Sequence, residues 1–190
     1  MFELKDYQNK YIKRLKEAIK DSLKSPEEEI CVFQSPTGSG KTLMVAECLK
    51  DLVNECEENN LSFVWVSVRK LHDQSKEKLE KYYETSRKLK CSHFNDLIEK
   101  RINRNEILFI NWESINKINK NTIIKENEKD FYLEKVIENT KEKGNEIILI
   151  IDESHHTASS DKSKELINLI SPKVTVEVSA TPHLKENISS

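Results

Sequence analysis

Glycine is scarce in this chain, with three among 190 residues, and two of the three fall within one nine-residue segment. Proline is nearly as rare, with four residues. No internal repeat or low-complexity linker interrupts the sequence. Few glycines and prolines, together with 34% charged residues, favour a soluble, helix-rich α/β protein. A chain of this length is expected to form one domain with its own core.

The chain also lacks an excess of positive charge. It has 31 basic and 33 acidic residues, for a formal net charge of −2. Any binding to nucleic acid must therefore come from a local patch. Lysine far outnumbers arginine, so an arginine at a functional position is the sharper signal. The arginines are Arg14, Arg69, Arg87, Arg101 and Arg104.

Paired cysteines and long apolar runs are absent as well. The four cysteines form no C-x-x-C pair, which predicts free thiols in a reducing cytosol. Cys91 and His93 could ligate a metal together, but two nearby ligands without a second pair usually occur by chance. We identify no signal peptide and no apolar run of membrane-spanning length. These features predict a cytoplasmic protein.

The two clustered glycines lie in the segment 34–42, which reads Gln-Ser-Pro-Thr-Gly-Ser-Gly-Lys-Thr. It follows a short apolar run at 30–33 and precedes a helical pattern over 43–52. A strand, a glycine-bearing loop, Lys-Thr and a helix in this order predict a phosphate-binding loop. Gly38 and Gly40 let the backbone wrap around a phosphate, where side chains would collide.

The chemistry of this loop suits ATP with its Mg²⁺. The loop N–H groups and the helix N-terminus face the anion with their positive ends. Lys41 can reach the β- and γ-phosphates, and the Thr42 hydroxyl can ligate Mg²⁺. One position departs from G-x-x-x-x-G-K-[ST], because Ser35 stands where the first glycine is usual. The expected nucleotide-binding loop residues are Pro36, Thr37, Gly38, Ser39, Gly40, Lys41 and Thr42.

Apolar runs alternate with helical patterns along the chain and predict a doubly wound, mainly parallel sheet with helices around it. Ligands of such sheets bind at the carboxyl ends of the strands. The stretch 116–146 is predicted to be a charged insertion, solvated unless it touches a substrate or partner. The predicted strands are 30–33, 61–68, 107–110, 147–151 and 173–178, and the predicted helices are 2–23, 70–89, 94–102 and one that passes through 131–140 and ends at Gly144.

A second acidic element follows the strongest predicted strand. The β-branched run 147–151 leads directly to Asp152, which can meet the Mg²⁺ held by Thr42. Glu153 can then orient or deprotonate an attacking water. The alternative is a helix N-terminus that simply attracts acids. The following pair, His155 and His156, could be a metal site or a polar turn, and no third ligand stands at metal spacing.

Four further segments resemble motifs of superfamily-two helicases. Residues 152–155 resemble the D-E-x-H form of motif II, and residues 179–182, Ser-Ala-Thr-Pro, match motif III. Residues 69–74, Arg-Lys-Leu-His-Asp-Gln, resemble motif Ia, and residues 4–8 resemble the glutamine motif. With the phosphate loop, five elements occur in family order over nearly the whole chain. The resemblance implies the first RecA-like motor lobe, spanning residues 1–190.

Within that superfamily the chain is similar to the motor part of type III restriction enzymes. The second histidine of 152–156, the segment 109–115 and the charged insert before motif II carry this likeness. It implies action on DNA more than on RNA, within a restriction or defence system. It also implies a second motor lobe, expected outside residues 1–190, and nuclease or methyltransferase subunits as partners.

The resemblance also implies roles for matched residues. Gln8 would contact the adenine, and Lys41, Asp152, Glu153 and His155 would form the catalytic set. For motif III the plainer interpretation is a strand end with a proline turn, and for motif Ia a solvated helix start. Residues implied in nucleic-acid contact or in coupling to it are Arg69, Lys70, Gln74, Asn111, Ser179 and Thr181, with His155 also implied in coupling.

Alternatives to the ATPase lobe remain open from the sequence. One is a non-catalytic nucleotide-binding module that serves as a docking lobe. Another is a different phosphate-loop enzyme such as a small-molecule kinase, although we find no arginine-rich lid segment. A lobe of a DNA-repair or RNA helicase is a third. In each motor interpretation, arginine fingers would come from a second lobe, and the chain alone is expected to hydrolyse ATP very slowly.

Overall fold

The computed structural model describes residues 4–68, 71–86, 88–112, 133–153 and 161–180, with no side-chain description for 161–163. Six parallel strands form one sheet in the order β1-β6-β5-β2-β4-β3. This confirms the predicted parallel α/β fold. The strands are β1 (Glu29–Ser35), β2 (Leu61–Ser67), β3 (Lys90–Ser92), β4 (Glu106–Asn111), β5 (Glu146–Asp152) and β6 (Val174–Ala180).

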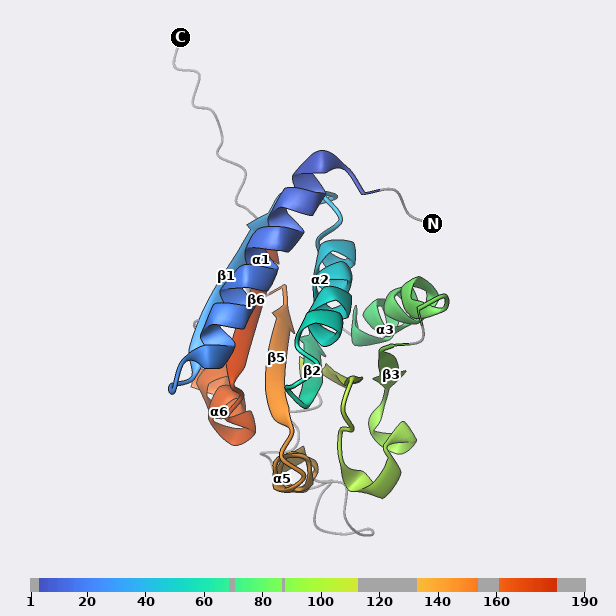
Figure 1. The fold of residues 1–190 in the computed structure, drawn as a ribbon. Helices are drawn as coiled ribbons and strands as arrows, with labels where there is room; N and C mark the ends of the chain where they lie inside the picture. Colours follow the sequence, from blue (N-terminus) through green and yellow to red (C-terminus); the bar gives the residue numbers. More distant parts are fainter. Residues whose placement is uncertain (1–3, 69–70, 87, 113–132, 154–160, 181–190) are drawn as a thin grey trace.

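Helices cover both faces of the sheet, and α1 and α2 lie side by side across one of them (Figure 1). The cluster on that face joins α1, α2 and α3 to the strands, and the cluster on the other face joins α5 and α6 to them. The helices are α1 (Asp6–Lys24), α2 (Lys41–Glu55), α3 (Leu71–Tyr83), α5 (Leu133–Glu142) and α6 (Asp161–Ile170).

The central strands are apolar because both of their faces are covered. In β2, Phe63 and Trp65 join the cluster under α1 to α3, while Val64 and Val66 join the cluster under α5 and α6. Successive side chains of a strand point to opposite faces, so a strand buried on both sides is a continuous apolar run rather than an alternating one. The same holds for β5, where only the first residue, Glu146, is not fully buried.

Three local features differ from the sequence prediction. The helix predicted over 94–102 is wrong: two 3-10 turns, η1 (Phe94–Asp96) and η2 (Ile98–Lys100), occupy it. Glu99 and Lys100 have φ of 56° and 52°, a left-handed conformation that cannot continue an α-helix. The short strand β3 and helix α6 were not predicted.

The described part of the charged stretch 116–146 contributes to the core. Helix α5 buries Leu133, Val136 and Ile137 against the sheet, and the preceding residues 116–132 lie outside the described residues. Gly144, with φ of 77°, follows the end of α5 as predicted. Among the described helices, none is both long and apolar enough to cross a membrane.

Candidate nucleotide-binding site

The predicted phosphate loop connects the end of β1 to the start of α2, at the carboxyl edge of the sheet. Gly38 and Gly40 both have positive φ, 78° and 87°. Gly40 is the N-cap of α2, and its carbonyl accepts the N–H of Met44 at 2.9 Å. A Cβ atom on Gly40 would lie 2.8 Å from Nε2 of Gln8. The backbone conformation therefore favours glycine at position 40, and a Cβ there would also displace the Gln8 amide.

The structure accounts for the serine at the first position of the loop motif. Ser35 is 1% exposed, and its Oγ donates to Oγ of Ser39 at 2.7 Å. The N–H of Ser39 donates to the carbonyl of Pro36 at 3.1 Å. The Ser35 side chain therefore closes the loop from inside, where a glycine would leave the Ser39 hydroxyl without this partner.

Lys41 is the cation of the loop. Its Nζ donates to the carbonyl oxygens of Ser35 and Pro36, each at 3.4 Å. These distances are long for a charged donor, whose hydrogen bonds are typically about 2.7–2.9 Å. The ammonium group is thus loosely held by neutral carbonyls and can turn to an anion in the cavity.

Asp152, at the end of β5, is a buried carboxylate on the same side of the sheet. It is 7% exposed and accepts the N–H of Glu153 at 3.0 Å. Burial, and then the charge of Glu153, raises the pKa of Asp152 to about 6. A bound cation at this carboxylate would favour its charged form. Glu153 itself has φ of 57°, an uncommon conformation for a non-glycine residue and one often found at functional sites.

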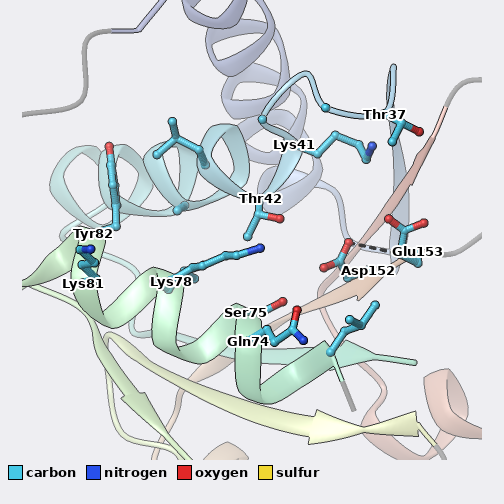
Figure 2. A pocket seen from close by; sticks show the side chains of 16 residues that line it. Thr37, Lys41, Thr42, Gln74, Ser75, Lys78, Lys81, Tyr82, Asp152 and Glu153 are labelled. Atoms are coloured by element: carbon cyan, nitrogen blue, oxygen red, sulfur yellow. Dashed lines mark hydrogen bonds between the residues drawn. The ribbon is translucent and has the colours of Figure 1, made fainter. Parts of the chain in front are cut away.

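These groups line one cavity of about 590 Å³, which also extends along α3. Figure 2 shows Thr37, Lys41 and Thr42 on one side of it and Asp152 and Glu153 on another, joined by their hydrogen bond. The predicted residue Gln74 lines it from α3 together with residues that the sequence did not indicate: Ser75, Lys78, Lys81 and Tyr82. Lys78, Lys81 and Tyr82 follow Gln74 by 4, 7 and 8 residues, the spacing of one helix face. The helical period, counted from Gln74, could therefore have predicted these three residues.

Gln8 lies against the outside of the loop and is not among the residues lining the cavity. It is 7% exposed, its Nε2 donates to the carbonyl of Ser39 at 2.9 Å, and its Oε1 accepts the N–H of Lys5 at 3.0 Å. Tyr7 Oη donates to the same Ser39 carbonyl at 3.1 Å. The start of α1 is therefore tied to the phosphate loop.

Ser179 lies between the two halves of the site. Strand β6 runs between β1 and β5, with Ser179 beside Gln34 and Val178 beside Asp152. Asn111 ends β4, beside Ser67 at the end of β2. The remaining predicted residues, Arg69, Lys70, His155 and Thr181, lie outside the described residues, so the structure does not place their side chains.

Fold and site together define a RecA-like α/β lobe in which the predicted phosphate loop and a buried carboxylate line one cavity. The model of the family described as "Type III restriction enzyme, res subunit" matches residues 1–184, and the chain belongs to this family. No curated protein sequence matches the chain.

Two solved structures are similar in fold. One is the Sulfolobus solfataricus SWI2/SNF2 ATPase core in complex with dsDNA, with a TM-score of 0.60 and 18% identity. The other is a nuclease-deletion mutant of the type ISP restriction-modification enzyme LlaGI with a DNA substrate mimic, with a TM-score of 0.53 and 15% identity. Each match covers 95% of this chain but only 32% and 18%, respectively, of the other chains. Identities this low establish the shared fold alone.

Proposed function

We propose that this chain is the ATP-binding motor lobe of a nucleic-acid-dependent ATPase or translocase of helicase type. The observation that carries the proposal is the pairing of a glycine-shaped cradle with a buried carboxylate across one cavity. A cradle of N–H groups and Lys41 suits the phosphates of a nucleotide. The buried Asp152 suits the divalent cation that accompanies them.

In this proposal each cavity residue has a distinct role. Lys41 would contact the nucleotide phosphates, and Thr42 and Asp152 would hold the Mg²⁺ that accompanies them. When bound, Mg²⁺ neutralises charge that develops on the phosphate oxygens. Glu153 accepts a proton from, or orients, the attacking water. Residues 36–40 enclose the phosphates, and Gln8 contacts the adenine.

We further propose DNA as the track and restriction or defence as the setting. The family membership supports the setting, and both similar structures are complexes with DNA or a DNA mimic, which supports DNA over RNA. Arg69, Lys70, Gln74 and Asn111 are the proposed contacts to the nucleic acid or its coupling elements. The residues proposed to couple nucleotide state to that track are His155, Ser179 and Thr181.

In this proposal residues 1–190 form a single lobe. A second motor lobe supplies the arginine fingers, and nuclease or methyltransferase subunits are further partners. Among the described residues that line the cavity, none is an arginine. An arginine finger is typically worth about 10³–10⁵ in rate. The isolated lobe is therefore proposed to bind ATP and to turn it over very slowly.

Calorimetry of Mg²⁺–ATP binding to wild type and Lys41→Ala tests the phosphate-loop assignment. The substitution should weaken binding roughly tenfold to a hundredfold, since a charged hydrogen bond contributes about 1.5–3 kcal/mol. Lys24→Ala is the matched control, because Lys24 is 75% exposed and pairs only locally with Asp21. Equal affinity of wild type and Lys41→Ala, with both folded, would refute the assignment.

A further inference from the structure

Three metal-ligating side chains meet at the start of α3, outside the nucleotide cavity. They are His72 and Asp73, in the first turn of α3, and His93, in the turn between β3 and η1. Their candidate ligand atoms all lie within 4.8 Å of one another. None of the three lines the nucleotide cavity. The cluster therefore needs an explanation separate from ATP binding.

The cluster is centred on one carboxylate oxygen. Oδ1 of Asp73 lies 3.3 Å from Nε2 of His72 and 3.5 Å from Nε2 of His93. The two imidazole rings are 5.9 Å apart and inclined at 74°, so they approach edge to face rather than stacked. Both Nε2 atoms thus approach the same oxygen from two different elements.

These separations fit a tetrahedral metal ion. Zinc binds imidazole nitrogen and carboxylate oxygen at about 2.0–2.2 Å, so adjacent ligand atoms of a tetrahedron lie about 3.3–3.5 Å apart. Octahedral coordination at the same bond lengths would bring neighbouring ligands to about 2.9–3.0 Å. The two observed distances to Asp73, 3.3 and 3.5 Å, match the tetrahedral spacing.

The surroundings of the cluster also suit a bound ion. The side chains of His72, Asp73 and His93 are 15%, 55% and 39% exposed, so one side is open to a water ligand. Asp96 accepts the backbone N–H of His93 at 2.8 Å and holds the turn that carries this ligand. Three protein ligands and one water are a known coordination set for zinc.

We propose that His72, Asp73 and His93 bind Zn²⁺, which joins the first turn of α3 to the turn after β3. The ion would fix the start of the helix that carries Gln74, Lys78 and Tyr82 to the nucleotide cavity. From the sequence, Cys91 was the neighbour considered for His93, a pair that usually occurs by chance. Cys91 packs against the hydrophobic core and is not among the three clustered ligands.

Metal titration of the purified chain tests this proposal. After removal of metal with a chelator, Zn²⁺ is titrated by calorimetry, and Co²⁺ is titrated by visible absorption. We expect one ion per chain, intense bands of tetrahedral Co²⁺, and their loss when Zn²⁺ is added. His72→Gln, Asp73→Asn and His93→Gln should each weaken Zn²⁺ binding at least tenfold, since even outer-sphere changes cost roughly 10–100-fold.

The controls address the other ligands in the sequence. Cys91→Ser and the double variant His155→Gln/His156→Gln should bind Zn²⁺ as tightly as wild type. Circular dichroism and urea unfolding show whether each variant remains folded. Zn²⁺ should raise the Tm of wild type but not that of His93→Gln.

Three results would overturn the proposal: no stoichiometric binding by wild type, unchanged affinity in folded His72→Gln or His93→Gln, or loss of binding in a control variant. The first result would leave Asp73 as an ion-pair partner of the two histidines. The zinc test and the phosphate-loop test are separate. Lys41→Ala is expected to lose ATP affinity but to bind Zn²⁺ as wild type does, so a failed zinc test leaves the phosphate-loop assignment unchanged.

Discussion

The two edges of the sheet each bury a carboxylate, and the two carboxylates differ in their environment. Asp152 lies at the carboxyl edge, where burial raises its pKa to about 6. Glu106 lies at the amino edge and is less exposed to solvent, at 1% against 7%, yet its pKa is lowered. Burial alone therefore does not decide the charge state of these groups.

Hydrogen bonds make the difference at the amino edge. Glu106 accepts bonds from Ser92 Oγ at 2.5 Å, Lys90 Nζ at 2.8 Å, and the N–H and Nδ2 of Asn103 at 2.8 and 2.9 Å. Burial favours the neutral acid, and these donors outweigh it, with the Lys90 bond the largest of them. The negative charge of Glu106 is satisfied within the protein.

Neighbouring polar groups at the amino edge are satisfied in the same way. Ser62 donates to the carbonyls of Ile102 and Asn103, and Asn145 donates to Ser62 Oγ at 2.9 Å. Thr140 accepts the N–H of Ile102 at 2.9 Å. This edge joins β2, α5 and the turn before β4, and its polar groups therefore act in stability.

At the carboxyl edge, Lys41 and Asp152 form no ion pair with each other. Lys41 donates to two carbonyls at 3.4 Å, and the charge of Glu153 adds to the cost of ionising Asp152. Such an arrangement is costly in the absence of a ligand and is relieved when phosphate and cation bind. The comparison suggests that polar groups at this edge serve binding, and it predicts different outcomes for mutations at the two edges.

The largest expected effect concerns hydrolysis. In a longer chain that supplies the second lobe, Glu153→Gln should lower ATP turnover by about 10²–10⁴, the usual contribution of a general base. ATP affinity and the free energy of unfolding should stay close to wild type, because glutamine preserves the shape of the side chain. Steady-state turnover and calorimetry measure this. Retained turnover in Glu153→Gln would remove Glu153 from the chemistry.

The next effect is on stability at the other edge. Glu106→Ala should lower the free energy of unfolding by about 3–5 kcal/mol, because it leaves Ser92 and Asn103 without their acceptor and Lys90 without its partner. Urea unfolding measures the loss, and the exposed Glu84→Ala is the control. Glu106→Ala that remains folded should bind Mg²⁺–ATP as wild type does. A loss under about 1 kcal/mol would contradict the importance of this cluster.

How far the sequence predicts this molecule depends on whether a feature is local. The run Ile147–Ile151 predicts its strand because β-branched residues buried on both faces allow little else. The phosphate loop is equally local, since its spacing carries its geometry. In contrast, the left-handed Glu99 and Lys100 and the three-residue strand β3 depend on pairing with distant segments. Tertiary contacts decided both.

The site divides in the same way. Lys41 and Asp152 were predicted from motifs, but Lys78 and Tyr82 required knowledge of which face of α3 meets the loop. The approach of His72 to His93 joins positions 21 residues apart in sequence and was missed for that reason. Sequence spacing shows ligand pairs within one turn, whereas this cluster depends on the place of β3 at the edge of the sheet.

The acid dependence of stability is a smaller effect with a defined sign. The pKa of Glu106 is lower in the folded chain than its ordinary value of about 4.3. Its contribution to stability is therefore fully present above that value and is lost as the pH falls through the folded pKa. Unfolding free energies of wild type and Glu106→Gln, measured from pH 7 to pH 3, should converge as the pH falls. A constant difference between the two would contradict this prediction.

The smallest effect tests whether Gln8 reads the base or only holds the loop. Its hydrogen bonds to Ser39 and Lys5 use one of its two N–H donors and one lone pair, which leaves capacity for adenine. Gln8→Ala should narrow the preference for ATP over GTP by about fivefold, the equivalent of one hydrogen bond of about 1 kcal/mol. Competition binding with both nucleotides measures the ratio.

Tyr7→Phe is the matched control for Gln8→Ala, because Tyr7 donates to the same Ser39 carbonyl as Gln8. Loss of that bond alone should weaken ATP and GTP equally and leave their ratio unchanged. If Gln8→Ala, like Tyr7→Phe, leaves the ratio of ATP to GTP affinity unchanged, Gln8 acts only by positioning Ser39. The proposal that Gln8 recognises adenine would then be wrong. If only Gln8→Ala changes the ratio of ATP to GTP affinity, the nucleotide-binding site includes Gln8 of α1 as well as the carboxyl ends of the strands.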